Sequence, residues 1–308
     1  MTEPDAPQQD QIDELDAQSA IATGKLIQTA IVVAVIIAAA LAGFDYWRKK
    51  YGPKDTAPPP APDPDRRLFE PPPPPEVKGE DITLDLGEGV KMEFVHVPAL
   101  RIWVGKYEVT NEQYRRFKPD HKVGEFKSHP FDGPRQPAVK VMLPDVREYV
   151  QWMNGLCLDS LPPGRRIRLL DDREALALLS CGDDRTYPWG SDWPPPTNWN
   201  YHGIESAGPV PKIKEHRDPW PVTCPVDKSG KNDWGLYGIS DNVQEWTCMP
   251  RGAAIKRRTY DLIGASWYYG TQDYLKCGHL PKLGIKYSTY YVGMRLSIGP
   301  PERRVIPR

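Results

Sequence analysis

The sequence lacks the local motifs of several common enzyme classes, and it lacks an excess of charge of either sign. It contains no G-x-S-x-G nucleophile motif, no phosphate-binding glycine loop and no H-E-x-x-H zinc motif. The formal net charge of the 308 residues is −1. Nothing in this charge balance predicts the positive field that a nucleic-acid-binding surface needs, so we expect no nucleic-acid partner.

Cysteine pairs at metal-ligand spacing are also absent. No C-x-x-C pair occurs, and no histidine lies at ligand spacing from any of the five cysteines, which are Cys157, Cys181, Cys224, Cys248 and Cys277. This arrangement argues against a structural zinc site and against a dense disulfide framework. The odd number leaves at least one free thiol, which we expect to pack as a small apolar side chain.

The first 50 residues have the pattern of a membrane anchor. Residues 1–25 hold six Asp or Glu against one Lys, and we expect an acidic, disordered tail. Residues 26–44 carry no charge, and at about 1.5 Å per residue they span roughly 28 Å as a helix. Tyr46 and Trp47 follow where an aromatic belt would lie, so we expect one transmembrane helix over 26–47. A buried core helix is rarely apolar on every face, and a signal peptide has its basic residues before the apolar run.

Residues 48–80 combine a basic juxtamembrane segment with a proline-rich linker. Eleven of the 35 prolines lie between residues 52 and 80. Such a composition favours extended polyproline II at about 3.1 Å per residue, which gives a spacer of at most roughly 90 Å. A ligand for proline-binding modules is the alternative reading of the same prolines. Four Lys or Arg after the apolar run against one before it favour a cytoplasmic location for the C-terminal part.

Residues 81–300 have the length and pattern of a single domain of the α+β class, followed by a short tail at 301–308. Alternation around a glycine turn predicts a hairpin over 82–97. A capping box predicts a helix start at Thr110. Apolar spacing predicts a helix over 144–156, and the Asp171–Glu174 pair with Gly182 predicts another over 171–182. Beyond residue 182 periodicity is weak, so we expect short strands held by long ordered loops.

Six local motifs in one order resemble the formylglycine-generating enzyme, or sulfatase-modifying factor, family. They are VGKYEVTNEQYRRF (104–117), RIRLLDDREALALLSCG (166–182), YPWG (187–190), CPVDKSGKNDWGLYGISDNVQEWT (224–247), GASW (264–267) and VGMRL (292–296). The resemblance covers about 200 residues. It implies a loop-rich variant of the C-type lectin fold whose loops are commonly held by calcium.

The resemblance also locates the family's reaction centre, and this chain departs from the family there. Family enzymes carry two cysteines after a G-G-S-W motif, which hold copper(I) and oxidise a substrate cysteine to formylglycine. Counting from Trp267, these positions are Tyr269 and Tyr274. A phenol is not the soft thiolate ligand that copper(I) selects, so we expect neither copper nor the family's oxidase activity. The positions expected to line the former substrate groove are Ser266, Trp267, Tyr268, Tyr269 and Tyr274.

Two structural calcium sites are implied by the same resemblance. The first would use the Asn200 side chain, the Tyr201 carbonyl, Asp218 and the Trp220 carbonyl. The second would use the Glu245 carboxylate with the carbonyls of Gly238, Asp241 and Val243. Donor sets made only of oxygen suit a hard cation such as calcium. Loop capping by Asp218 and Glu245 through backbone N–H groups is the alternative.

These observations lead to one leading hypothesis and two alternatives. The leading one is a membrane-tethered, non-catalytic member of the family that binds a peptide, glycan or protein partner through the former groove. A scaffold subunit of a cell-envelope complex and an active oxidase with an altered site are the alternatives. Calcium sites and a stalk suit an extracytoplasmic domain, which we expect although the flanking charges argue the opposite.

Overall fold

The computed structural model describes residues 79–248 and 259–301, so the expected tail, anchor and linker lie outside the described residues. The predicted hairpin is confirmed: β1 (Ile82–Asp85) pairs antiparallel with β2 (Lys91–Val97). Its turn contains Gly87 and Gly89, whose φ angles of 83° and 78° favour glycine. Within 79–248 and 259–301, no helix combines the length and apolar character needed to cross a bilayer.

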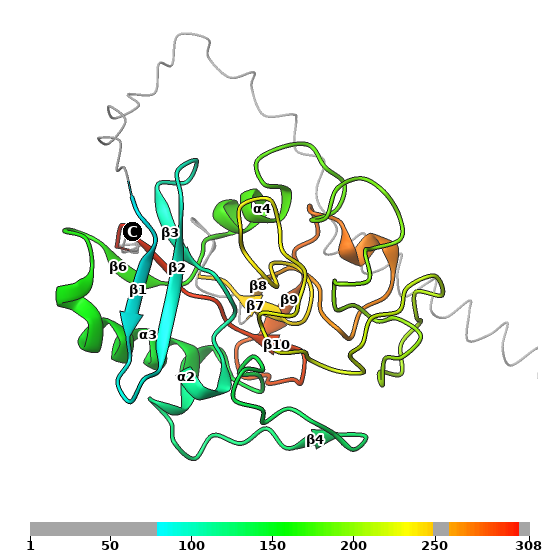
Figure 1. The fold of residues 1–308 in the computed structure, drawn as a ribbon, viewed down its shortest axis with the longest axis horizontal. Coiled ribbons are helices and arrows are strands. Elements are labelled where there is room, and N and C mark those ends of the chain that lie inside the picture. Colours follow the sequence, from blue (N-terminus) through cyan, green and yellow to red (C-terminus); the bar gives the residue numbers. More distant parts are fainter. Residues whose placement is uncertain (1–78, 249–258, 302–308) are drawn as a thin grey trace, which may run out of the picture. The chain divides into compact units, whose positions relative to one another are not determined.

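The hairpin belongs to a five-stranded antiparallel sheet that joins both ends of the domain (Figure 1). Its order is β1-β2-β3-β11-β6, in which the last three strands are β3 (Ile102–Gly105), β11 (Ser297–Gly299) and β6 (Arg166–Arg168). The C-terminal strand β11 therefore lies between two strands from the first half of the domain, and it aligns the loops on either side.

A second sheet contains the strands next to the GASW and VGMRL motifs. Its order is β10-β7-β8-β9, made of β10 (Val292–Gly293), β7 (Gln244–Trp246), β8 (Thr259–Ile263) and β9 (Lys282–Gly284). The GASW motif begins directly after β8, and VGMRL begins with β10. A short separate ribbon pairs β4 (Glu125–Phe126) with β5 (His129–Pro130).

The described helices begin where the sequence predicts them. They are α2 (Asn111–Arg115), α3 (Leu143–Cys157) and α4 (Asp172–Ser180), with the 3-10 turns η1 (Leu158–Ser160) and η2 (Gln272–Leu275). Both predicted capping boxes are present, at Thr110–Gln113 and Asp171–Glu174. The helix α4 ends in a left-handed residue, Cys181 with a φ of 49°, one position before the predicted stop at Gly182.

The main core lies between α3 and the two sheets. Val146, Tyr149 and Met153 on the predicted apolar face of α3 are fully buried, whereas Val150 is half-buried. They belong to the same cluster as Phe94 of β2 and Trp246 of β7. The result is a mixed α/β domain with few helices and short strands. The described residues 181–243 form no helix or strand, so the short strands expected beyond residue 182 occur only from β7 onward.

Candidate functional site

The segment that follows β8 is fixed from its first residue. Gly264 has a φ of 76°, and a Cβ atom there would lie 2.7 Å from the Cα of Ser240. The backbone N–H groups of Ala265 and Trp267 donate to the carbonyls of Ser240 (2.9 Å) and Asn242 (3.0 Å). The segment is therefore held against the 240–242 loop, and residues 268–274 project from that attachment.

Ser266 and Trp267 do not line a groove, which corrects the sequence-based expectation for these two residues. Both side chains are 0% exposed. The Trp267 indole donates to the carbonyl of Tyr290 at 3.1 Å, and the Ser266 hydroxyl accepts from the N–H of Tyr268 at 3.3 Å. The two residues hold the backbone of the segment in place, because the buried Trp267 ring and the Ser266 hydroxyl both hydrogen-bond to neighbouring backbone groups.

Two stacked pairs of tyrosines lie on this support, and we call them the tyrosine cluster: Tyr268, Tyr269, Tyr274 and Tyr291. The rings of Tyr269 and Tyr274 stack at 4.3 Å between centroids with a 12° interplanar angle. Tyr268 stacks on Tyr291 at 4.7 Å and 21°, and Tyr269 meets Tyr291 edge to face at 5.5 Å. All four are half-buried. The sequence analysis did not identify Tyr291, which directly precedes β10, the strand that pairs with β7, and carries no local signal.

The cluster has the wrong chemistry for a copper(I) site. Burial raises the pKa of the Tyr269 phenol, and its hydrogen bond with Tyr291 acts in the same direction. A neutral phenol supplies neither the charge nor the softness of a thiolate ligand. The two positions that hold cysteines in the family thus lie together in the structure, but they present stacked aromatic rings instead of metal-ligand atoms.

Cys277 does not replace the missing thiols. Its side chain is 7% exposed and its thiol donates to the carbonyl of Leu179 at 3.2 Å. Burial raises the pKa of this thiol to about 12, so it stays protonated and unreactive at neutral pH. None of the five cysteines, all of which lie in the described ranges, forms a disulfide.

An open pocket lies beside Cys277 and reaches the edge of the cluster. Its volume is about 430 Å³, and its lining residues are Arg185, Thr186, Asp273, Lys276, Cys277, Gly278 and His279. The His279 ring contacts the Tyr274 ring at 4.1 Å between centroids. The charged side chains of the lining are paired, Arg185 with Asp183 and Asp233, and Lys276 with Asp273. The pocket is therefore lined by paired charges, and its His279 contacts the tyrosine cluster.

The four residues predicted for the first calcium site come together around Asp218. Its carboxylate accepts from the N–H groups of Trp220 (2.6 Å) and Tyr201 (3.2 Å), and it lies 3.2 Å from His216 Nε2. Asn200 donates its amide to the carbonyl of Val222, whereas its Oδ1 is buried without a partner. The contacts of Asp218 with two backbone N–H groups are those of the loop-capping alternative, whereas the unpaired Asn200 Oδ1 is an oxygen acceptor of the kind that calcium prefers. No group of three His, Cys, Asp or Glu with metal-binding geometry occurs in the described ranges.

Glu205 and His216 border this first site and had no sequence signal. Both carboxylate oxygens of Glu205 are buried without a partner, and burial raises the pKa of Glu205. Burial also disfavours the charged form of His216, but the hydrogen bond and charge of Asp218 outweigh it and raise the pKa of His216. The site therefore has acceptor oxygens in excess of the donors that face them.

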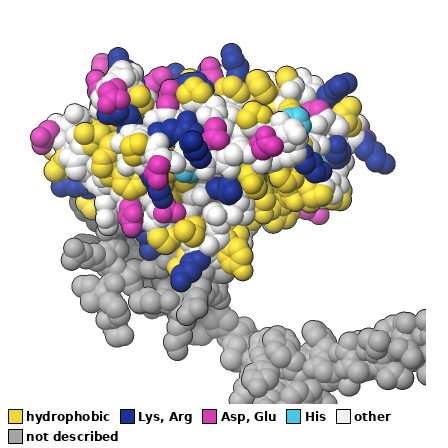
Figure 2. Space-filling view, turned by 90° about the horizontal axis from the view of Figure 1, so that it is seen from below, with side chains coloured by type: hydrophobic (Ala, Val, Ile, Leu, Met, Phe, Trp, Pro, Cys, Tyr) yellow, Lys and Arg dark blue, Asp and Glu magenta, His cyan; other side chains and the backbone are white. Residues whose placement is uncertain are grey.

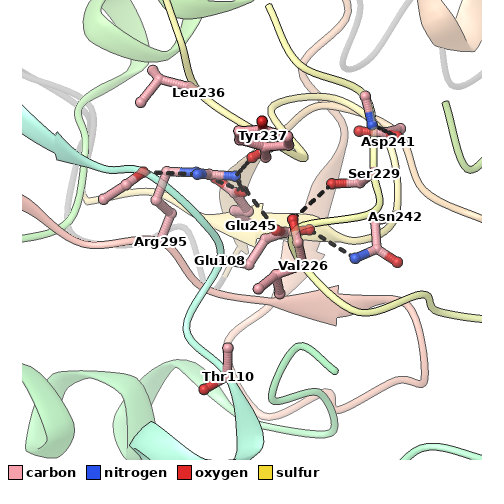
Figure 3. A network of polar contacts seen from close by, with 12 residues as sticks. Glu108, Thr110, Val226, Ser229, Leu236, Tyr237, Asp241, Asn242, Glu245 and Arg295 are labelled. Carbon is pink, nitrogen blue, oxygen red and sulfur yellow. Dashed lines mark hydrogen bonds and ion pairs between the residues drawn. The ribbon is translucent and has the colours of Figure 1, made fainter. Parts of the chain in front are cut away.

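The second predicted site is organised differently, as Figure 3 shows. Both oxygens of Glu245 accept hydrogen bonds from Arg295, at 2.9 and 3.1 Å from Nε. Asp241 is 0% exposed and accepts from the N–H groups of Asn200 and Gly230, both at 2.8 Å. Burial raises the pKa of Asp241 to about 7. Glu108, which the sequence did not mark, lies in the same network, and burial raises its pKa well above the usual range.

Comparison with known proteins agrees with this fold. The model of the sulfatase-modifying factor enzyme 1-like domain matches residues 84–297. The formylglycine-generating enzyme of Thermomonospora curvata is 29% identical over 115 residues, which are 37% of this chain and 34% of that protein. The inactive C-alpha-formylglycine-generating enzyme 2 of Bos taurus is 31% identical over 134 residues, 42% of this chain and 38% of that protein. Each match thus spans little more than a third of the relative's length.

Solved structures share the fold at lower identity. Treponema denticola variable protein 1 has a TM-score of 0.54 at 17% identity, over 71% of this chain and 99% of its own. PvdO from Pseudomonas aeruginosa has a TM-score of 0.51 at 17% identity, over 72% and 99%. Likeness at this identity shows the fold alone. The family model matches well over half of the sequence, and the chain belongs to the sulfatase-modifying factor enzyme 1-like family.

Proposed function

We propose that this protein is a membrane-tethered, non-catalytic member of its family, and that the tyrosine cluster binds a peptide, glycan or protein partner. The observation that carries the proposal is the stacked Tyr269–Tyr274 pair at the family's two cysteine positions. The pair removes the thiols and leaves ring faces and hydroxyl groups at the same place. The relative named as an inactive formylglycine-generating enzyme 2 is compatible with a non-catalytic role.

Binding is favoured over a purely structural role by the position of the cluster. Its four rings are half-buried rather than enclosed, and they continue to a pocket of about 430 Å³. Tyrosine is enriched at recognition surfaces, because one rigid ring offers apolar area and a polar hydroxyl together. On the face presented in Figure 2, hydrophobic side chains gather in patches between the charged ones.

The anchor and the linker complete the proposal. The apolar helix expected over 26–47 tethers the chain to the bilayer, and the prolines of 52–80 hold the domain away from it. We place the domain, a variant of the C-type lectin fold, on the extracytoplasmic side, where a structural calcium ion at Asn200 and Asp218 would stabilise the long loops. The positive residues after the anchor favour the opposite side, and this bias weighs against the placement.

The test compares cluster variants with a matched surface variant. Tyr269→Ala and Tyr274→Ala should each weaken partner capture from envelope extracts by about 1–3 kcal/mol, as expected of contact residues at the centre of an interface. Tyr287→Ala is the control, since Tyr287 is 66% exposed and lies outside the cluster. Melting temperatures of all three variants are measured on the same samples. Collapse of the two cluster variants to unfolded protein would show that the rings serve as core and would remove this proposal.

The two alternatives have separate outcomes. Capture that survives both cluster variants supports a scaffold role through another face, such as the end of α3, where Leu156 and Leu158 are 48% and 42% exposed. Copper-dependent oxygen consumption with a cysteine-containing peptide would support an active oxidase. The buried, protonated Cys277 thiol argues against that third outcome.

A further inference from the structure

Glu245, the charged ligand expected for a second calcium ion, already has a cation beside it. Arg295 Nε lies 2.9 Å from Oε1 and 3.1 Å from Oε2 of Glu245, and Arg295 Nη2 lies 2.7 Å from Oε1. Each of the two side chains is 1% exposed. A charge-assisted pair of this kind neutralises a buried carboxylate without any metal.

The remaining donors of the guanidinium collect oxygen atoms from two other segments. Arg295 Nη1 donates to the carbonyl of Gly105 at 2.8 Å, at the end of β3, and Nη2 donates to the carbonyl of Tyr237 at 2.6 Å. Carbonyl and carboxylate oxygens are the atoms that a hard cation would otherwise gather. Through these contacts the guanidinium of Arg295 connects the end of β3, Glu245 of β7 and the loop that contains Tyr237. Figure 3 shows part of this network.

Glu108 closes the other side of this position. Its Oε1 accepts from Asn242 Nδ2 at 3.0 Å, and its Oε2 lies 3.8 Å from Arg295 Nη2. A Cβ atom on Gly238 would lie 2.3 Å from Glu108 Oε1. The Glu108 carboxylate therefore packs directly on the backbone of Gly238, one of the residues whose carbonyl would ligate the ion.

We infer that Arg295 supplies the cation at this position and that Glu245 binds no calcium in this chain. A divalent ion on the Glu245 carboxylate would lie beside the guanidinium, and like charges repel strongly in a buried, low-dielectric site. At the Asn200–Asp218 site the carboxylate lies beside His216 rather than beside an arginine, and Asn200 Oδ1 is buried without a partner. At most one of the two calcium ions implied by the family resemblance therefore remains.

The experiment measures bound calcium per chain on the full-length protein in detergent. Purified protein is dialysed to equilibrium against calcium, and metal content is determined by mass spectrometry for the wild type, Glu245→Gln and Asp218→Asn. We expect at most one ion in the wild type and an unchanged number in Glu245→Gln. Asp218→Asn is the matched control, and it should lose the ion if the first site holds one.

The outcomes separate this inference from the proposal of a structural calcium ion. Two ions in the wild type overturn the inference, even if Glu245→Gln does not fold. One ion that is lost in Glu245→Gln and kept in Asp218→Asn also overturns it. A wild type without calcium supports the inference and removes the structural calcium from the proposed function.

Discussion

A phenol and a thiol differ in softness, size and acidity, and Tyr269 and Tyr274 change all three properties at the family's cysteine positions. Their ring faces need about the separation that is observed, 4.3 Å between centroids, to stack. Stacked rings present their faces, and neither residue offers a sulfur atom to a metal. At the scale of single residues, therefore, the same backbone supports a different kind of surface.

His121 gives a prediction for pH at this scale. Burial lowers the pKa of His121, the charges of Arg115 and Lys118 lower it further, and Asp132 and Asp145 oppose them. Its Nε2 is buried without a partner, and its ring meets Tyr114 edge to face at 4.7 Å. Because the folded pKa lies below the unfolded value of about 6.5, the neutral ring stabilises the fold above pH 6.5. This contribution is lost as pH falls through the folded pKa.

We therefore expect His121→Phe, which keeps an aromatic ring against Tyr114, to lose less stability than the wild type between pH 7 and pH 5. Urea unfolding at several pH values measures the difference between the two proteins. An identical pH dependence in both would show that His121 titrates as it does in the unfolded chain. His129, a half-buried residue on the β4–β5 ribbon, offers the matched control as His129→Phe.

At the scale of elements, capping explains which helices could be predicted. Thr110–Gln113 and Asp171–Glu174 are local signals, because the bonded partners lie three residues apart. The hairpin over 82–97 is local in the same sense. The strands β6, β7, β10 and β11 have two or three residues each, and their partners are distant in sequence. A segment of two or three residues is too short to show the alternation of apolar and polar residues that predicts a strand. Only pairing in the assembled sheet defines it.

Glu174 of the α4 capping box also pairs with Arg168 of β6, and this pair gives the second prediction. Glu174 accepts from the N–H of Asp171 at 2.9 Å and pairs with both terminal nitrogens of Arg168 at 2.7 Å. Asp171→Ala should lower the free energy of unfolding by about 1 kcal/mol, as the loss of an N-cap does. Glu174→Ala should cost more, about 3–5 kcal/mol, because it also leaves the largely buried Arg168 without its carboxylate.

Denaturant unfolding measures both values, and Arg173→Ala on the exposed face of α4 is the control. Equal effects of Asp171→Ala and Glu174→Ala would mean that the Arg168 pair contributes nothing beyond the cap. Such a result would mean that Glu174 stabilises the protein only through the capping box of α4.

At the scale of the whole molecule, the candidate site could be predicted only in part. Tyr269 and Tyr274 follow from counting along the chain, and Asn200, Tyr201, Asp218 and Trp220 do come together. Trp267 is buried against the rings of Phe126 and Phe131, and sequence spacing does not reveal this contact. The pairing of Arg295 with Glu245 joins residues 50 positions apart and reaches Gly105, 190 positions away. Contacts of this range appear only when the two sheets and their loops are assembled.

A further prediction is that calcium binding stabilises the loops around Asp218. Calcium should raise the melting temperature of the wild type, because an ion that binds only the folded state stabilises it by mass action. Asp218→Asn should lower that increase, since it removes the one carboxylate of the first site. Thermal unfolding with excess calcium and with a chelator measures both effects. Superimposable curves for the wild type under the two conditions would mean that the loops are held without metal.

The last prediction concerns membrane insertion of the expected anchor, and its basis is the sequence of residues 26–47. Val35 lies near the centre of the uncharged run, so Val35→Arg places a charge near the middle of the bilayer. Insertion scales put the cost at about 2.5–3.5 kcal/mol, which should reduce the share of the protein in the membrane fraction. Ala57→Arg is the matched control, because it adds the same charge in the proline-rich linker and should leave fractionation unchanged. Deletion of residues 1–50 should release the domain completely. If the deleted form sediments with membranes as the full chain does, the domain binds the membrane by another route, and the anchor is not what tethers it.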